Sequence, residues 1–106
     1  MIIKAYQTGF HREGPVKIRP VAVPDGDYSN DDLLEETFRL GQNMFQPLDG
    51  FYSVSVGDVV ELPDGSLHCC APSGWLQLEA GVDPTSLVGG DILSKASQLS
   101  APAGKD

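Results

Sequence analysis

The chain has 106 residues, of which 15 are acidic and seven are basic, and its formal net charge at pH 7 is −8. This length fits one domain, and a hydrophobic content of 41% is sufficient for a core, so general disorder is excluded. The acidic balance argues against sequence-independent binding to DNA, RNA or anionic lipid, and no apolar run is long enough to span a membrane.

The first part of the chain predicts two strands joined by a loop. Residues 2–7 alternate between apolar and polar positions, as a half-buried strand does, and glycines and a proline mark residues 8–15 as a loop. Residues 16–23 form a second alternating run. Pro20 has no N–H for a ladder hydrogen bond, so we expect this second strand at a sheet edge and paired with the first as an antiparallel hairpin.

The alternation also predicts the faces of the second strand. We expect the apolar side chains of Val16 and Ile18 to face the core. The charged side chains of Lys17 and Arg19 are then expected to face water.

A helix is predicted after a turn at residues 24–27. Ser29 has the position of an N-cap, and Gly41 is a natural stop. Between them the apolar face repeats at the helical period through Leu33, Leu34, Thr37, Phe38 and Gly41. The spacing of Glu35 and Arg39 predicts an ion pair across one helical turn.

The second part of the chain predicts the rest of a sheet. A β-rich run at residues 51–62 is followed by the turn sequence at 63–65, a further run at 66–71, and a short strand at 75–78. We therefore predict an α+β fold in the order ββαβββ, a small antiparallel sheet of about five strands with one packed helix. The expected core comprises Val54, Val56, Val59, Leu62, Leu34, Phe38 and Trp75.

The composition changes after Glu79. Residues 1–79 are expected to form the single α+β domain, and residues 80–106 are rich in Gly, Ser, Ala and Pro. A faint helical period at residues 91–99 predicts one marginal helix. We expect this segment to be a flexible tail that adds little to stability.

Three segments together resemble a known family. The sequences at residues 38–43 and 52–60, followed by Gly74-Trp75, resemble the small YodL-like proteins and related uncharacterised open reading frames of phages and other mobile elements. The resemblance covers about residues 30–78. It implies a short helix, a serine-rich strand and a closing strand that begins with Gly and an aromatic residue, together with a phage or mobile-element origin. It implies no catalytic residues, and the Cys69-Cys70 pair lies outside the pattern.

Residues able to carry catalysis or bind a metal are few and poorly spaced. Asp58 is interpreted as a turn aspartate rather than a lone base, because a catalytic carboxylate needs a partner. Cys69 and Cys70 are adjacent, so they face opposite sides of a strand, one thiol buried and one partly exposed. With His68 they provide too few ligands for zinc, and His11 lies in a loop. We therefore expect no catalytic, cofactor-binding or metal-binding residue.

An acidic run begins before the predicted helix and continues through its first half. It comprises Asp25, Asp27, Asp31, Asp32, Glu35 and Glu36. The spacing does not fit a calcium loop. The run is either a solvated helix start, where the helix dipole favours acids, or a surface that binds a basic partner.

Basic residues gather instead near the start of the chain. Residues 1–19 carry four basic residues and one acid. Tyr6 offers a ring on which a base can stack, and Arg12, Lys17 and Arg19 offer positive charge for phosphates. These four residues define an alternative nucleic-acid face.

The leading hypothesis from the sequence is a non-enzymatic accessory protein of a phage or mobile element, which contacts an unidentified host or phage protein through its acidic surface. A small nucleic-acid-binding module that uses the N-terminal basic strand is the first alternative. An enzyme with an unrecognised site is the second. The N-terminal residues lack the basic-then-apolar pattern of a signal peptide, so a cytoplasmic location is expected.

Overall fold

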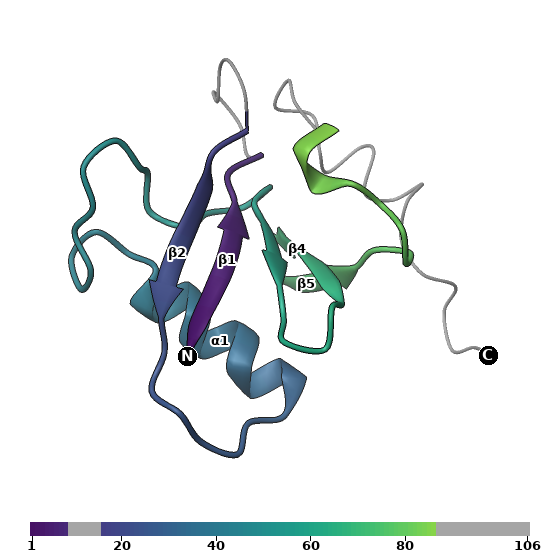
Figure 1. Ribbon diagram of the computed structural model, residues 1–106, viewed down its shortest axis with the longest axis horizontal. Helices are drawn as coiled ribbons and strands as arrows, with labels where there is room; N and C mark the ends of the chain where they lie inside the picture. Colours follow the sequence, from purple (N-terminus) through teal and green to yellow (C-terminus); the bar gives the residue numbers. More distant parts are fainter. Residues whose placement is uncertain (9–15, 87–106) are drawn as a thin grey trace.

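One helix packs against one face of a five-stranded antiparallel sheet in the computed structural model, which describes residues 1–8 and 16–86 (Figure 1). The elements are β1 (Ile2–Tyr6), β2 (Ile18–Ala22), α1 (Asn30–Leu40), β3 (Val59–Glu61), β4 (Leu67–Ala71), β5 (Gly74–Gln77) and a short 3₁₀ helix, η1 (Pro84–Ser86). The fold is therefore α+β, in the predicted order ββαβββ. The predictions for residues 9–15 and for the tail beyond residue 86 lie outside the described residues.

The order of the strands in the sheet is β2-β1-β3-β4-β5, and every neighbouring pair is antiparallel. β1 lies between the hairpin partner β2 and the later strand β3, so Ala5 is opposite Arg19 on one side and Val60 on the other. The chain reaches β3 from β2 through α1, which lies behind β1 and β2 in Figure 1. The N-terminal strand is thus held on both sides.

The helix begins and ends where its sequence predicts. Ser29 is the N-cap, and its hydroxyl oxygen accepts a hydrogen bond from the backbone N–H of Asp32 at 3.1 Å. Gly41 is the C-cap. The predicted pair of Glu35 and Arg39 is wrong, because Arg39 instead donates to both carboxylate oxygens of Glu36, which is one residue closer at i,i+3.

Apolar side chains form two clusters, one on each face of the sheet. The first lies between sheet and helix and contains Ile3, Ala5, Val21, Val23, Leu33, Leu34, Val54, Val60 and Leu62. The second lies on the opposite face and contains Tyr6, Val59, Leu67, Cys69 and Leu78. Val16, Leu76 and Val82 pack against the second cluster, so part of the segment predicted as tail contacts the sheet.

The predicted core is mostly confirmed, with two adjustments. Val54, Val59, Leu62 and Leu34 are buried, whereas Val56, Phe38 and Trp75 are half-buried. Val59 belongs to the cluster on the face opposite the helix, so it does not join helix to sheet as expected.

The serine-rich part of the β-rich run is irregular rather than a strand. β3 begins only at Val59. The backbone N–H of Val54 donates instead to the carbonyl of Gly41 at 3.0 Å, which ties this segment to the end of the helix. The approach is close: a Cβ on Gly41 would lie 2.5 Å from Cγ2 of Val54, so the glycine is required here. A contact with α1 thus replaces the expected strand pairing.

The predicted faces of β2 are reversed. Arg19 is buried and lies on the helix side of the sheet, while Lys17 and Ile18 are exposed and Val16 is half-buried. The cause is the segment between α1 and β3, residues 42–58, hereafter the connector. It offers hydrogen-bond acceptors to the Arg19 guanidinium on that side.

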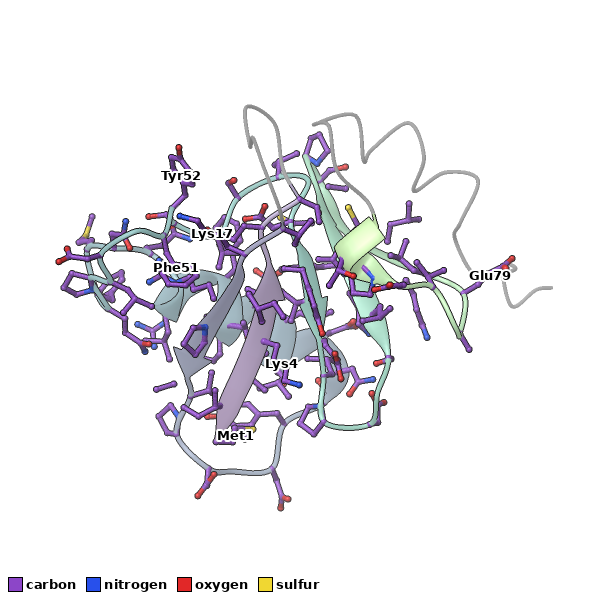
Figure 2. All side chains as sticks on the ribbon, turned by 45° about the horizontal axis from the view of Figure 1, so that its top comes forward. Met1, Lys4, Lys17, Phe51, Tyr52 and Glu79 are labelled. Atoms are coloured by element: carbon purple, nitrogen blue, oxygen red, sulfur yellow. The ribbon has the colours of Figure 1, made fainter. Side chains whose placement is uncertain are left out.

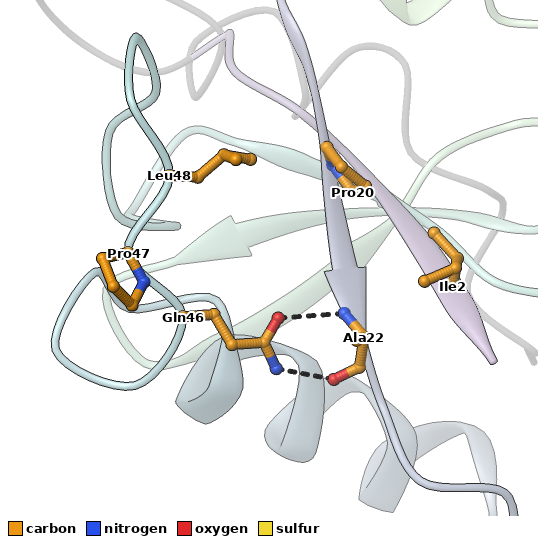
Figure 3. A pocket seen from close by; sticks show the side chains of 6 residues that line it. All are labelled: Ile2, Pro20, Ala22, Gln46, Pro47 and Leu48. Carbon is orange, nitrogen blue, oxygen red and sulfur yellow. Dashed lines mark hydrogen bonds between the residues drawn. The ribbon is translucent and has the colours of Figure 1, made fainter.

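The predicted edge position of β2 is confirmed, and a side chain covers that edge (Figure 3). The Gln46 carboxamide accepts from the Ala22 N–H at 3.0 Å and donates to the Ala22 carbonyl at 2.7 Å. These are the two bonds that a neighbouring strand would make there. Pro20, two residues away, offers no N–H.

Candidate protein-interaction surface

The six acids predicted as a partner-binding site lie on one continuous stretch of chain. Asp25 and Asp27 are in the loop between β2 and α1, and Asp31, Asp32, Glu35 and Glu36 are on α1. All are exposed except Glu36, which is half-buried. We call these six residues the acidic surface.

Internal partners neutralise only part of the acidic surface. The N-terminal ammonium group bonds to Asp25 at 3.0 Å, and Arg39 bonds to Glu36 at 2.8 Å. Within residues 1–8 and 16–86, the carboxylates of Asp27, Asp31 and Asp32 form no ion pair. These groups therefore remain available to a basic partner.

Asp64 extends the acidic surface beyond the residues predicted from the sequence. The side chain of Asn30, the first residue of α1, donates to Asp64 Oδ2 at 3.2 Å, which brings the turn between β3 and β4 next to the helix start. Hydrogen bonds from the hydroxyl and the backbone N–H of Ser66 lower the Asp64 pKa to about 2. The sequence marks Asp64 only as a turn residue, because its contact with Asn30 spans 34 residues.

A hollow of about 200 Å³ opens where α1 meets β5. We call it the aromatic hollow; it is lined by Glu35, Phe38, Cys70, Ala71, Pro72, Gly74 and Trp75. The Phe38 and Trp75 rings pack edge to face, with centroids 6.4 Å apart and planes at 83°. The Trp75 indole N–H donates to Glu35 Oε2 at 3.0 Å, so one acid of the acidic surface is held at the hollow.

The described members of the alternative nucleic-acid face, Tyr6, Lys17 and Arg19, do not form one exposed basic surface. Tyr6 is buried, and its hydroxyl donates to Glu61 at 2.8 Å. Burial and this acceptor raise the Tyr6 pKa to about 12. Lys17 is exposed but lies over Phe51, 5.9 Å from the ring centroid, and bonds to the carbonyl of Gly50 (Figure 2). Arg12 lies outside the described residues.

Arg19, the fourth residue of that face, is a structural anchor. It is 1% exposed, and its guanidinium donates to Asn43 Oδ1 at 2.6 Å and to the carbonyls of Gln46 and Tyr52 at 2.5 and 2.8 Å. All three acceptors belong to the connector. Burial lowers the Arg19 pKa. Buried in this way, Arg19 cannot reach a phosphate.

The thiols and Asp58 have structural surroundings. Both Cys69 and Cys70 are buried, which corrects the expectation that one would be partly exposed. Burial raises the pKa of Cys69 to about 12 and that of Cys70 to about 11, so neither supplies a thiolate near neutral pH. Asp58 accepts from the backbone N–H of Ser55 at 3.0 Å, next to Gly57 with φ of 94°, as expected for a turn aspartate.

A serine, a histidine and an aspartate meet at the start of β4, but in the wrong order for a hydrolase. Ser66 Oγ lies 2.5 Å from Asp64 Oδ1 and 2.8 Å from His68 Nε2, so the serine is between the other two. A catalytic triad needs the histidine in the middle, where it removes the serine proton. When Ser66 donates to Asp64, the histidine can only donate to Ser66. This cluster therefore lacks an activated nucleophile.

Comparison with protein-family models, with curated proteins and with solved structures gave no match to this chain. Across the described residues, no group of three or more His, Cys, Asp or Glu side chains could hold a metal ion. The helix that is described there is too short and too polar to cross a membrane.

Proposed function

We propose that this protein is a non-enzymatic accessory protein of a phage or other mobile element, and that it binds a basic segment of another protein through its acidic surface. The observation that carries the proposal is the row of exposed carboxylates in the loop before α1 and in its first turn, where Asp27, Asp31 and Asp32 have no basic partner among the described residues. The phage or mobile-element origin is supported by the sequence resemblance alone.

The location of these acids favours a binding role. Asp31 and Asp32 lie in the first turn of α1, where the helix dipole favours negative charge, so these acids are compatible with a stable helix. Exposed charges contribute mainly to the rate and selectivity of association, and salt screens them. The partner is therefore expected to be basic and to bind faster at low ionic strength.

The experiment compares two labelled probes of similar length, a lysine- and arginine-rich peptide and a single-stranded oligonucleotide. Fluorescence anisotropy measures the binding of each at several salt concentrations. We expect the peptide to bind, with an affinity that falls as salt rises, and the oligonucleotide not to bind.

Two double variants locate the binding surface. D31N/D32N removes two charges from the acidic surface, and D49N/E79Q removes two charges from exposed positions outside it. We expect the first variant to lose affinity about tenfold and the second to stay within about threefold of wild type. Thermal melts confirm that both are folded. Equal losses, or oligonucleotide binding that K17E abolishes, would overturn the proposal.

A further inference from the structure

The aromatic hollow combines two features that recognise a cation, ring walls and a carboxylate. We infer that it accepts the side chain of one arginine from the basic segment that the acidic surface binds. This assignment rests on the proposed function and adds to it the chemistry of one anchoring residue.

The rings supply the first feature. Phe38 and Trp75 both line the hollow, and their planes are nearly perpendicular, so they form two adjoining walls. Arginine stacks on aromatic faces, and tryptophan is the strongest ring partner for a cation. Both rings are half-buried, so they present area to a ligand while their packing against the first cluster holds them in place.

Glu35 supplies the second feature. Its Oε2 accepts the indole N–H of Trp75, which fixes the carboxylate beside the ring before any ligand arrives. Oε1 accepts no hydrogen bond from the part of the chain that the structure describes. A guanidinium group can donate to that oxygen while its plane lies on the indole. Because the bond to Trp75 already orders the Glu35 side chain, binding loses less conformational entropy.

The charge around the hollow selects against other occupants. Asp31 and Asp32 precede Glu35 by four and three positions, so the three acids follow one side of α1 from its start to the hollow. An acidic side chain would be repelled there. An apolar side chain would cover the Glu35 carboxylate without replacing its lost water. A basic segment can pair its side chains with the carboxylates of Asp31 and Asp32 and place one arginine in the hollow beside Glu35.

The test uses two short peptides that differ at one atom position. Each carries two lysines, and one has a single arginine where the other has citrulline, which keeps the shape of arginine but is uncharged. Trp75 is the only tryptophan, so its fluorescence reports directly on the hollow. We expect the arginine peptide to change Trp75 emission and to bind about tenfold more tightly than the citrulline peptide.

Single variants provide the matched comparison. Glu35→Gln removes the charge at the hollow, and Asp49→Asn removes one charge from an exposed position outside the acidic surface. We expect E35Q to weaken binding of the arginine peptide about tenfold and binding of the citrulline peptide by no more than about threefold, and D49N to leave the affinity for both peptides close to wild type. Wild-type protein with the two peptides decides the question even if E35Q fails to fold.

The outcomes separate the two proposals. If both peptides bind equally and D31N/D32N weakens both, the acidic surface binds basic segments but the arginine assignment is overturned. If neither peptide binds at low salt, the proposed function fails, and the assignment fails with it.

Discussion

Arg19 gives the most demanding test of how the connector is held in place. Its guanidinium makes three hydrogen bonds to the connector, and each bond from a charged donor contributes about 1.5–3 kcal/mol. Against this gain stands the cost of burying the charge, several kcal/mol for an ion in a protein interior. Arg19→Met removes both terms and leaves the carbonyls of Gln46 and Tyr52 without their donor. We expect a net loss of about 3 kcal/mol in the free energy of unfolding.

Urea denaturation followed by Trp75 fluorescence measures this loss. Arg19→Lys is the matched variant, because it keeps the charge but has one nitrogen where the guanidinium uses two. We expect Arg19→Lys to lose about 2 kcal/mol, because lysine cannot reach all three acceptors. Hydrogen exchange adds a local readout. Arg19→Met should raise the exchange rates of amides in residues 42–53, relative to wild type, more than it raises those of amides in β4. An Arg19→Met protein within about 0.5 kcal/mol of wild type would refute the anchoring role.

Three further predictions concern packing and ionisation. Gly41→Ala should lower the free energy of unfolding, measured by urea denaturation, by about 2 kcal/mol, because the added Cβ would lie 2.5 Å from Val54 Cγ2. The control Gly26→Ala, whose added Cβ has its nearest contact at 3.3 Å, should change that free energy little. Native Cys69 and Cys70, with pKa values of about 12 and 11, should resist alkylation at pH 8 and react on unfolding; rapid native labelling would contradict their burial. Because the folded Tyr6 pKa of about 12 lies above its ordinary value of 10.0, wild-type stability should fall as pH rises from 10 to 12. Denaturation at pH 9 and 11 should show a smaller fall in Tyr6→Phe, and equal falls would refute the shift.

Signals between near neighbours in the sequence predicted structure well. Ser29 caps a residue three positions away, and Gly65 takes the positive φ of 87° that its turn requires. Pro20 marked an edge strand because its missing N–H acts locally. In each case the deciding atoms lie within a few residues, so the sequence contains the whole interaction.

Long-range contacts decided the features that the sequence did not predict. Arg19 has acceptors 24 to 33 residues away, and without them an arginine in an alternating strand is expected to face water. The irregular segment before β3 follows from the bond between Val54 and Gly41, which competes with strand pairing.

The candidate surface likewise has one part that near neighbours in the sequence reveal and one part that depends on long-range contacts. The acidic run is visible in the sequence, since its six members lie within the twelve residues 25–36. The aromatic hollow is not visible, because the bond between Trp75 and Glu35 spans 40 residues and depends on how β5 and α1 pack. No local pattern marks this combination of ring and carboxylate.

The Gln46 carboxamide has a consequence for solubility. An uncovered outer strand can act as a template on which copies of a chain add to one another and grow into fibrils. Here the Ala22 donor and acceptor are already occupied by Gln46, and Pro20 interrupts the donor row beside them. Exposed apolar side chains such as Ile2 and Ile18 can therefore lie near this edge without seeding polymerisation through β2.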